Sequence, residues 1–372
     1  MYRVIGVPKE VKDSERRVSV QPDGAAELVH HGHRVLVESG AGAGAGFSNE
    51  EYEVAGAEIV PTADEVFEAA DLLVKVKEPV PEEYERFKEG QELFTYLHLA
   101  ADKELTEFLM ERKINTLAYE TVELPDGSLP LLTPMSEVAG RMAVQAAAHH
   151  LESPQEGAGL LLGGVPGTPA AKVTIIGGGI SGTEAAKIAV GMRAIVRVLD
   201  INPKRLAYLS DIFEGRVDLV SPNRARTASY VAESDVVIGA VLVAGAKAPK
   251  LVSREMISAM KPGSVVADIA IDQGGCFETS RPTTHSDPTY VEEGGVHYCV
   301  ANIPGAVART STLALTSATL PYLVKIAGSG IEGAAADDPV LAKGLSTLGG
   351  ELVSGPVAEA HGLNYARPRV HN

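Results

Sequence analysis

The sequence predicts an α/β protein with two domains, in which parallel strands alternate with helices. Three observations support this prediction. Short strand-like runs alternate with helical patterns through most of the 372 residues. Runs such as "VTII" (173–176) and "VVIGAVLV" (236–243) are apolar throughout, which is typical of strands covered on both faces. A Gly- and Pro-rich connector, 153–172, separates the two series of strands.

The first series of strands occupies the first third of the chain. Its strand-like runs are Arg3–Val7, Arg34–Val37, Leu72–Val76, Leu93–Leu97 and Thr116–Ala118. A helical pattern over Asp102–Arg112, with Asp102 as its N-cap, lies between the last two. This alternation predicts helical crossovers between parallel strands.

The second series lies in the middle of the chain. Its strand-like runs are Val173–Ile176, Ile195–Leu199, Val236–Gly239 and Ser264–Ile269, with a helical pattern over Gly182–Val190. Two long helical patterns flank the series, one over Ser136–Glu152 with Ser136 as N-cap, and one over Gly305–Ala327. We therefore predict one domain over 137–303 and a second domain that combines residues 1–136 with 304–372.

Composition and charge limit the classes of function. The net charge of −16 argues against a nucleic-acid partner, because contacts with phosphate backbones need clustered Lys and Arg. The start of the sequence lacks the basic and apolar segments of a secretion signal. No apolar run reaches the ~20 residues that span a bilayer. The two cysteines, Cys276 and Cys299, lack metal-ligand spacing. We expect a cytoplasmic protein with reduced thiols and no metal.

A dinucleotide-binding loop is predicted after the strand-like run Val173–Ile176. Gly177, Gly179 and Gly182 form the pattern G-x-G-x-x-G before a helical pattern, and Asp200 ends the next strand-like run 23 positions after Gly177. Such a loop holds a pyrophosphate at the amino end of its helix, and such an acid binds the ribose hydroxyls. A carboxylate there repels a 2′-phosphate, so the pattern favours NAD over NADP.

Arg205 follows Asp200 by five positions and has two interpretations. Its charge can soften the preference for NAD by attracting a 2′-phosphate. Alternatively, it is a solvated charge on a helix. The sequence alone leaves both interpretations open.

A second glycine run, "SGAGAGAGFS" (39–48), resembles such a loop in letters only. Gly40, Gly42 and Ala45 satisfy the relaxed motif. However, the helical pattern after it, with Ser48 or Asn49 as N-cap, begins with acidic side chains, which are poor neighbours for a pyrophosphate. The next strand-like run also ends without an acid. We predict a connector that does not contact the nucleotide.

Polar residues at the ends of strand-like runs supply the candidate chemistry, because ligands of open α/β sheets lie beyond the carboxyl ends of strands. Lys75 and Lys77 end one run, and His98 ends another. Arg16–Arg17 lie in the loop after the first run, and Asp272 follows a run in the middle domain. Each has a plainer interpretation as a solvated, packing or turn-forming residue.

Together these residues form a complete catalytic set. Arginine can hold a carboxylate through two hydrogen bonds, lysine can polarise a carbonyl, and histidine can move a proton near neutral pH. The arginine, lysine and histidine belong to one predicted domain and the nucleotide loop to the other. An interdomain cleft would bring them together.

Several longer segments carry a family resemblance. They are "GVPKEVKDSERRV" (6–18), "LLVKVKEP" (72–79), "FTYLHLA" (94–100), "LLTPMSEVAGRMAVQAAAHHLE" (131–152), "DVVIGAVLVAGAKAPKLVS" (235–253), "DIAIDQGGCFETSRPTTH" (268–285) and "VANIPGAVARTSTLALTSATLPY" (300–322). With them the chain resembles the bacterial alanine dehydrogenases over essentially its whole length. The resemblance implies reversible, NAD-dependent oxidative deamination of L-alanine to pyruvate and ammonium. It also implies two Rossmann-like, doubly wound domains with an interdomain cleft, and a homo-hexamer.

The resemblance also implies roles for single residues. Arg17 matches the carboxylate-binding arginine, Lys77 the substrate-binding lysine, His98 the catalytic histidine and Asp272 the catalytic aspartate beside the nicotinamide. Arg16 is the alternative to Arg17, but the spacing to the following strand-like run favours Arg17. Besides Gly177, Gly179, Gly182, Asp200 and Arg205, the expected NAD contacts are Ser136, Ile180, Ser181, Val241, Leu242, Ile269, Asn302 and Ile303.

The implied mechanism uses this set in sequence. Arg17 and Lys77 hold the carboxylate of alanine while its Cα hydride passes to the nicotinamide. His98 is the general base for the water that attacks the resulting iminium, and Asp272 stabilises the cationic amine and iminium.

Three other functions compete with this hypothesis. One is the NAD(H)-binding component of a proton-pumping transhydrogenase, which is similar in fold. The second is another amino-acid dehydrogenase of the same group, such as one acting on lysine and a keto acid. The third is an NAD-sensing regulatory module, which would not need the arginine, lysine, histidine and aspartate set.

Overall fold

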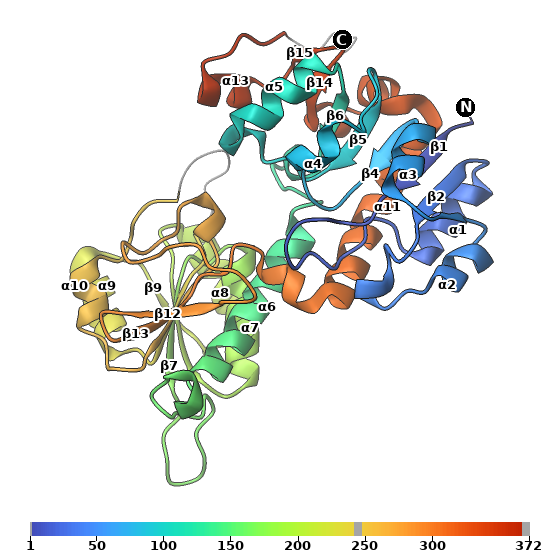
Figure 1. Cartoon of the computed structure of the whole chain (residues 1–372). Coiled ribbons are helices and arrows are strands. Elements are labelled where there is room, and N and C mark those ends of the chain that lie inside the picture. The colour runs from blue at the N-terminus through green and yellow to red at the C-terminus, as the bar shows by residue number, and fades with distance from the viewer. Residues whose placement is uncertain (1, 242–247, 367–372) are drawn as a thin grey trace. The chain divides into compact units, whose positions relative to one another are not determined.

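The computed structural model describes residues 2–241 and 248–366. The chain divides into two compact units, one formed by Met1–Met135 with Val307–Asn372 and the other by Ser136–Ala306. Each unit contains its own twisted sheet with helices packed on it (Figure 1). Leu242, one of the predicted NAD contacts, lies outside the described residues.

The first unit is built on an eight-stranded sheet with the order β15-β14-β6-β5-β4-β1-β2-β3. Its strands are β1 (Val4–Val7), β2 (Arg34–Glu38), β3 (Glu58–Val60), β4 (Leu72–Val74), β5 (Glu92–Thr95), β6 (Asn115–Ala118), β14 (Leu345–Leu348) and β15 (Glu351–Leu352). The strands β1 to β6 are mutually parallel, whereas β14 pairs antiparallel with β6 and with β15.

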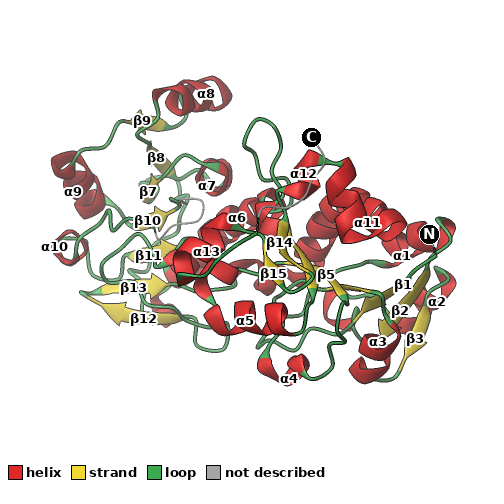
Figure 2. Cartoon of the chain, turned by 90° about the horizontal axis from the view of Figure 1, so that it is seen from above, coloured by secondary structure: helices red, strands yellow, loops and turns green. Residues whose placement is uncertain are grey.

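Helices cover both faces of this sheet. They are α1 (Pro22–His30), α2 (Asn49–Val54), α3 (Ala63–Ala69), α4 (Pro81–Tyr84), α5 (Lys103–Glu111), α11 (Ala308–Asp337), α12 (Pro339–Ala342) and α13 (Gly355–His361). Figure 2 shows α3 and α5 on one side of the sheet and α1 and α11 on the other. Asp102 caps α5 by accepting from the backbone N–H of Leu105, as predicted.

The second unit is built on a seven-stranded sheet with the order β12-β13-β11-β10-β7-β8-β9, in which only β12 is antiparallel. Its strands are β7 (Lys172–Ile176), β8 (Ile195–Leu199), β9 (Asp218–Val220), β10 (Val236–Gly239), β11 (Val265–Asp268), β12 (Thr289–Glu292) and β13 (Gly295–Tyr298). Its helices are α7 (Ile180–Gly191), α8 (Pro203–Phe213), α9 (Arg224–Glu233) and α10 (Arg254–Ser258), together with most of α6 (Thr133–His150).

Two apolar clusters flank this second sheet. The larger joins α6, α7 and α8 to the strands through residues such as Val144, Ala185 and Leu209. The smaller joins α9 and α10 to the sheet through residues such as Val231 and Ile257. Because both faces are covered, a central strand such as β10 (Val236–Gly239) is apolar and buried over its whole length, as the sequence pattern indicated.

The parallel parts of the two sheets have the same strand order. In the first unit it reads β3-β2-β1-β4-β5-β6, and in the second β9-β8-β7-β10-β11-β13, which is the order of the Rossmann fold. The prediction of two doubly wound α/β sheets is confirmed. In such sheets ligands bind beyond the carboxyl ends of the strands where the order reverses, which is between β1 and β4 and between β7 and β10.

Two helices extend beyond their predicted limits. The helix α6 begins at Thr133, so Ser136 lies in its first turn and the prediction that Ser136 is the N-cap was wrong. The helix α11 runs to Asp337, with a break at Gly330 (φ 80°, ψ 168°). The carboxylate of Glu92 accepts from the N–H of Ile331 at 3.2 Å, so it caps the segment after the break.

None of the helices in the described part of the chain combines the length and apolar character that a membrane crossing needs.

Candidate active site

Arg17 lies in the loop after β1, buried against an acid of the same loop. Only 3% of Arg17 is exposed. Its Nε and Nη2 atoms donate to the carboxylate oxygens of Glu15 at 2.7 and 2.5 Å, and Nη1 lies 3.0 Å from Sδ of Met135. The two-point contact fixes the plane of the guanidinium group. The neighbouring Arg16 is exposed, so the two arginines considered from the sequence have different surroundings.

Lys77 follows β4 and is a half-buried cation. Burial lowers the pKa of Lys77, and the nearby charge of Arg17 lowers it further, while Glu78 opposes the shift. Within residues 2–241 and 248–366 its ammonium group has no hydrogen-bond or ion-pair partner. A desolvated cation next to a second cation is suited to bind an anion, because a bound carboxylate relieves the repulsion between them.

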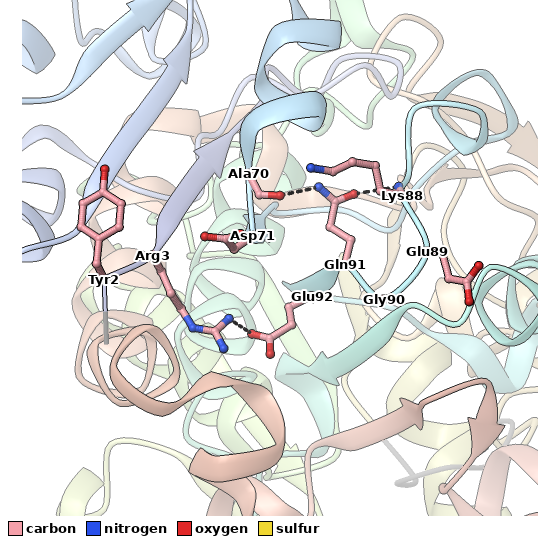
Figure 3. A pocket seen from close by; sticks show the side chains of 9 residues that line it. All are labelled: Tyr2, Arg3, Ala70, Asp71, Lys88, Glu89, Gly90, Gln91 and Glu92. Atoms are coloured by element: carbon pink, nitrogen blue, oxygen red, sulfur yellow. Dashed lines mark hydrogen bonds and ion pairs between the residues drawn. The ribbon is translucent and has the colours of Figure 1, made fainter.

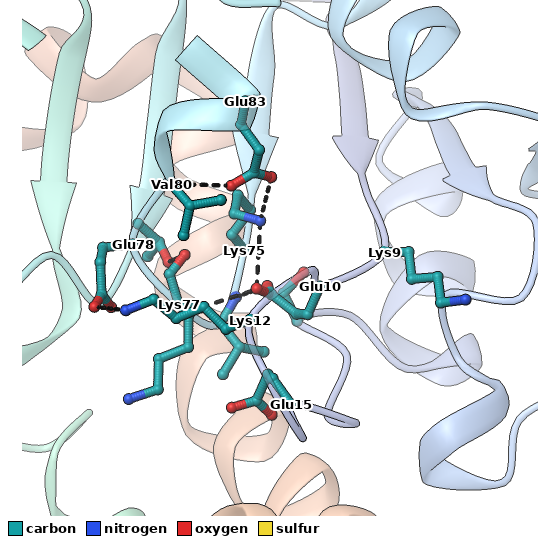
Figure 4. Close-up of polar contacts among 12 residues, drawn as sticks. Lys9, Glu10, Lys12, Glu15, Lys75, Lys77, Glu78, Val80 and Glu83 are labelled. Carbon is teal, nitrogen blue, oxygen red and sulfur yellow. Dashed lines mark hydrogen bonds and ion pairs between the residues drawn. The ribbon is translucent and has the colours of Figure 1, made fainter. Parts of the chain in front are cut away.

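Lys75 comes from the same strand end but has different surroundings. It is fully buried, and its ammonium group donates to Glu83 at 2.8 Å and to Glu10 at 3.3 Å (Figure 4). Both carboxylates satisfy Lys75 inside the protein, whereas Lys77 extends away from them. Of the two predicted lysines, only Lys77 is therefore available for a ligand.

His98 follows β5 in a strained backbone conformation. Its φ and ψ are 50° and 33°, in the left-handed region that non-glycine residues rarely adopt. Its backbone N–H donates to Glu120 at 2.6 Å, and its exposed ring lies parallel to that of Tyr96, with 5.9 Å between the centroids. Such strain persists where the surroundings impose it, which is common at functional sites.

Glu120 and Tyr96 are supporting residues that sequence reasoning missed. The carboxylate of Glu120 also accepts from the N–H of Leu97 at 3.2 Å, so it fixes the chain on both sides of the Leu97–His98 bond. The hydroxyl of Tyr96 donates to the carbonyl of Leu131 at 2.5 Å. Glu120 follows the end of β6 closely, so the strand-end criterion that identified His98 could have found it too.

The nucleotide loop at Gly177 has the geometry that a pyrophosphate requires. Gly177 has a φ of 101°, and a Cβ added to it would lie 2.7 Å from the carbonyl oxygen of Ala240. A Cβ on Gly182 would lie 1.8 Å from the carbonyl oxygen of Gly177, so glycine allows the helix to pack this closely. A Cβ on Gly179 would meet no atom within 4 Å. The open space above Gly179, at the amino end of α7, fits a phosphate group.

Gly179 is therefore the position where a ligand role can be separated from packing. We expect Gly179→Ala to fold with an unchanged melting temperature, because its added methyl group meets no protein atom. The same methyl group enters the space for the pyrophosphate, so NAD should bind at least about tenfold more weakly, a loss of about 1.4 kcal/mol. Calorimetric titration with NAD measures this loss.

Gly191→Ala is the matched control for this prediction. It lies at the end of the same helix, where an added Cβ also meets nothing, and far from the loop in sequence. It should leave NAD affinity unchanged. Equal NAD affinity in the Gly179→Ala variant and in the unchanged protein would remove this loop from the nucleotide site.

Asp200 and Arg205 both contact the loop. The carboxylate of Asp200 accepts from the N–H of Gly178 and from the N–H of Asn202, each at 2.7 Å. Arg205 donates to the carbonyls of Gly178 and Gly179 and to the hydroxyl of Thr183, the last at 2.7 Å. Arg205 thus stabilises the loop through hydrogen bonds. Neither interpretation from the sequence, an attraction for a 2′-phosphate or a solvated helix charge, included this role.

Close packing explains the second glycine run. A Cβ on Gly42 would lie 2.7 Å from the ring of Tyr52, and one on Gly44 would lie 2.7 Å from Arg16. Arg309 donates to the carbonyl of Gly46 at 2.9 Å. Ser48 caps α2, one of the two caps predicted. Gly42, Gly44 and Gly46 therefore serve the packing of the loop, whereas a Cβ on Gly40 would meet nothing and its φ of 76° is the reason for glycine there.

Comparisons with known proteins find related domains for both parts of the chain. Residues 6–139 match the family model "Alanine dehydrogenase/PNT, N-terminal domain", and residues 143–355 match the model "Alanine dehydrogenase/PNT, C-terminal domain". The alanine dehydrogenases of Methanococcus maripaludis and Halomonas elongata are each 56% identical to the chain, over 97% of both sequences. The chain belongs to the alanine dehydrogenase/PNT family.

Two solved structures are similar to the chain to different degrees. An L-alanine dehydrogenase superposes with a TM-score of 0.93 at 52% identity, and covers 96% of this chain and 99% of its own. A transhydrogenase from Sinorhizobium meliloti superposes with a TM-score of 0.81 at 25% identity, and covers 95% of this chain and 99% of its own. The resemblance stated from the sequence is confirmed, and of these two structures the L-alanine dehydrogenase is the more similar to the chain.

In this family member, Asp272 lies exposed in the short turn Ile271–Gln273 after β11. A second aspartate, Asp268, holds this region and was missed by sequence reasoning. It is fully buried, and it accepts from the N–H groups of Ala270 and Cys276 and from the hydroxyl of Ser280, at 3.1, 2.8 and 2.6 Å. These contacts fold the chain back on both sides of Asp272.

The two cysteines of this family member are structural. Both are buried. Burial raises the pKa of the Cys276 thiol to about 12 and that of Cys299 to about 11. Burial therefore disfavours the thiolate form, which is the nucleophilic form of cysteine. The described residues contain no cluster of three or more His, Cys, Asp or Glu side chains that could hold a metal ion.

The remaining predicted nucleotide contacts in the second unit lie at the starts of two helices or after the carboxyl ends of strands. Ser136 lies in the first turn of α6, and Ile180 and Ser181 begin α7. The two helices meet closely, since a Cβ on Gly140 would lie 2.1 Å from the carbonyl oxygen of Ser181. Four further residues follow the carboxyl ends of β10, β11 and β13: Val241, Ile269, Asn302 and Ile303.

A hollow of about 470 Å³ lies at the amino ends of the strands of the first sheet, whereas the candidate residues follow the carboxyl ends (Figure 3). Its residues precede β1, β4 and β5 or begin β5. Arg3 pairs with Glu92 at 2.7 Å, Asp71 accepts from the N–H of Val4 at 2.8 Å, and Gln91 donates to the carbonyl of Ala70 at 2.8 Å. Because these residues lie at the amino ends of the strands, and ligands of such sheets bind beyond the carboxyl ends, this hollow is not the candidate active site.

Proposed function

We propose that this protein is an NAD-dependent L-alanine dehydrogenase, which converts L-alanine to pyruvate and ammonium and catalyses the reverse reaction. The observation that carries the proposal is the nearness of two cations: the charge of the buried Arg17 helps to lower the pKa of Lys77, whose ammonium group lacks a partner among the described residues. Two neighbouring cations are suited to bind one small carboxylate. The alanine dehydrogenases at 55–56% identity support the substrate.

The substrate carboxylate lies between Arg17 and Lys77 in this proposal. Glu15 already occupies one edge of the Arg17 guanidinium, so it holds the arginine in one orientation. Lys77 approaches the carboxylate as a point charge from the neighbouring strand end. Fixing both carboxylate oxygens fixes the position of Cα and leaves rotation about the bond between the carboxylate carbon and Cα as the remaining freedom, which lowers the entropic part of the barrier.

His98 and Asp272 handle protons and positive charge. NAD, held by the Gly177 loop and Asp200, supplies the hydride acceptor when bound. His98 removes the proton from the water that attacks the iminium carbon, and it returns protons as the amine leaves. Asp272 stabilises the positive charge of the amine and iminium.

The lowered pKa of Lys77 predicts how pyruvate binding depends on pH. The pKa of Lys77 lies below its ordinary value of 10.5. Only the protonated form binds a carboxylate, so the KM for pyruvate should rise as the pH increases through a pKa below 10.5. In Lys77→Arg the rise should move beyond the measured range, because the guanidinium pKa exceeds ~12. A KM for pyruvate with the same pH profile in both proteins would exclude Lys77 as the titrating group.

We also propose a cytoplasmic homo-hexamer, on the basis of the family alone. Sedimentation analysis of the full chain tests the assembly, and a mass corresponding to fewer or more than six chains would contradict it.

An assay with NAD and L-alanine tests the function. We expect NADH to form with L-alanine and not with lysine or glutamate. NADH formation only with another amino acid would keep the class of enzyme and replace the substrate. Hydride exchange between NADH and an NADP analogue without amino-acid turnover would favour a transhydrogenase component, and NAD binding without any turnover would favour a sensing module.

A further inference from the structure

A buried charged triad contacts the backbone that leads to Lys77 and takes no part in the proposed chemistry. It consists of Lys75, Glu10 and Glu83, whose side chains are 0, 3 and 2% exposed. Lys75 donates to Glu83 at 2.8 Å and to Glu10 at 3.3 Å (Figure 4). Burial of three ionised groups costs free energy, and well-packed apolar side chains are often equally stable in such places. Stability alone is therefore a weak reason for the triad.

The triad joins three segments of the first unit. Glu10 belongs to the loop after β1, which also carries Arg17. Lys75 follows β4 and leads to Lys77. Glu83 belongs to α4, and its second carboxylate oxygen accepts from the N–H of Val80 at 3.1 Å. The loop with Arg17 and the strand end with Lys77 are thus tied to one ammonium group.

Glu10 also contacts the backbone that carries Lys77. One of its carboxylate oxygens accepts from the N–H of Val76 at 2.6 Å and from the N–H of Lys77 at 3.4 Å. The other accepts from Lys75. Both carboxylate oxygens of Glu10 therefore hold the segment Lys75–Lys77. Because Glu10 belongs to the loop that carries Arg17, it restrains the position of the Lys77 backbone relative to that loop.

We propose that Glu10 is a positioning residue, which sets the distance between Arg17 and Lys77 so that both cations meet one carboxylate. This inference rests on the proposed function, in which Lys77 binds the substrate. It predicts that loss of Glu10 weakens binding of pyruvate and alanine but not of the nucleotide, because the Gly177 loop belongs to the other unit.

Two substitutions of Glu10 and one control test the proposal. Glu10→Ala removes all three contacts of Glu10 and leaves Lys75 paired with Glu83, so no buried charge is left alone. Glu10→Gln keeps an oxygen for the N–H of Val76 but loses the charged contact with Lys75. Glu82→Ala is the control, because Glu82 is an exposed acid on the same helix as Glu83.

We expect Glu10→Ala to raise the KM for pyruvate by about ten- to a hundredfold, the scale of a misplacement of about 1 Å. The KM for NADH should stay within about twofold, an energy of about 0.4 kcal/mol by the standard relation between affinity and free energy. Glu10→Gln should fall between Glu10→Ala and the unchanged protein, and Glu82→Ala should match the unchanged protein. A lower melting temperature with an unchanged KM for pyruvate would reduce Glu10 to a structural role.

Labelling of Lys77 separates this inference from the proposed function. An amine-selective reagent followed by peptide mass spectrometry reports the reactivity of Lys77 without any turnover. In the unchanged protein, pyruvate should protect Lys77, and absence of protection would contradict the proposed site itself. Protection in the unchanged protein with equal protection in Glu10→Ala would overturn only the positioning role. If Glu10→Ala does not fold, protection of Lys77 by pyruvate is compared between Glu10→Gln and the unchanged protein. Equal protection in these two proteins would also contradict the positioning role of Glu10.

Discussion

Replacement of His98 should lower turnover by at least ~100-fold, the contribution that a positioned acid–base group typically makes. His98 lies at a strand end with an exposed ring and a backbone held by Glu120, so its loss removes the proton-transfer group and leaves its surroundings intact. NAD binding should be unchanged, because the nucleotide loop belongs to the other unit. Steady-state kinetics in both directions and calorimetric titration with NAD measure the two effects.

The left-handed backbone of His98 determines which substitution is informative. Alanine at a φ of 50° adds backbone strain, whereas asparagine adopts this region readily. His98→Asn therefore removes the imidazole with little strain, and a comparison with His98→Ala separates strain from chemistry. Near-normal turnover in His98→Asn would exclude His98 from the mechanism.

Replacement of Lys77 by methionine should abolish efficient use of the substrate without harming the fold. Loss of one partner of a buried, hydrogen-bonded charge pair costs about 2–5 kcal/mol, so kcat/KM for pyruvate should fall by about 30- to 4000-fold. No protein group loses a partner, since the ammonium group of Lys77 has none among the described residues.

The stability of Lys77→Met should equal or exceed that of the unchanged protein. Burial lowers the pKa of Lys77 in the folded state, so the folded state disfavours the charged form. This cost is fully present below the folded pKa and disappears as the pH rises through the unfolded value, so the gain from methionine should be largest at neutral pH and vanish near pH 10.5. Denaturant unfolding at several pH values measures it.

Lys75→Met provides the contrast two positions away. It leaves Glu10 and Glu83 buried without their cation, which should destabilise the fold by about 3–5 kcal/mol. If Lys77→Met lost stability as Lys75→Met does, or kept its kcat/KM for pyruvate, the assignment of Lys77 to the substrate would be wrong.

The sequence predicted those parts of the fold and of the candidate site that depend on local signals. The Gly177 loop could be recognised because strand, glycines, helix and Asp200 follow one another within a short segment. His98, Lys77 and Asp272 could be proposed because strand ends in parallel sheets mark ligand sites.

The supporting residues could not be predicted in this way, because their roles depend on partners far away in sequence. Glu10 contacts Lys75 and Val76, which lie 65 and 66 positions later. Asp268 and Glu120 bind backbone groups of loops whose course only the folded chain shows. Lys75 and Lys77 look alike in sequence, and only burial separates an internal ion pair from an available cation. The antiparallel strands β14 and β15 are short and had no distinct pattern.

The most direct test of the account is to follow the hydrogen on Cα of alanine. The protein would be given NAD and L-alanine carrying deuterium at Cα, and the NADH formed would be analysed by mass spectrometry. With direct hydride transfer from Cα, the deuterium should appear in the NADH, together with pyruvate and ammonium in equal amounts. NADH without deuterium, or no NADH at all, would contradict direct hydride transfer from alanine to the nucleotide.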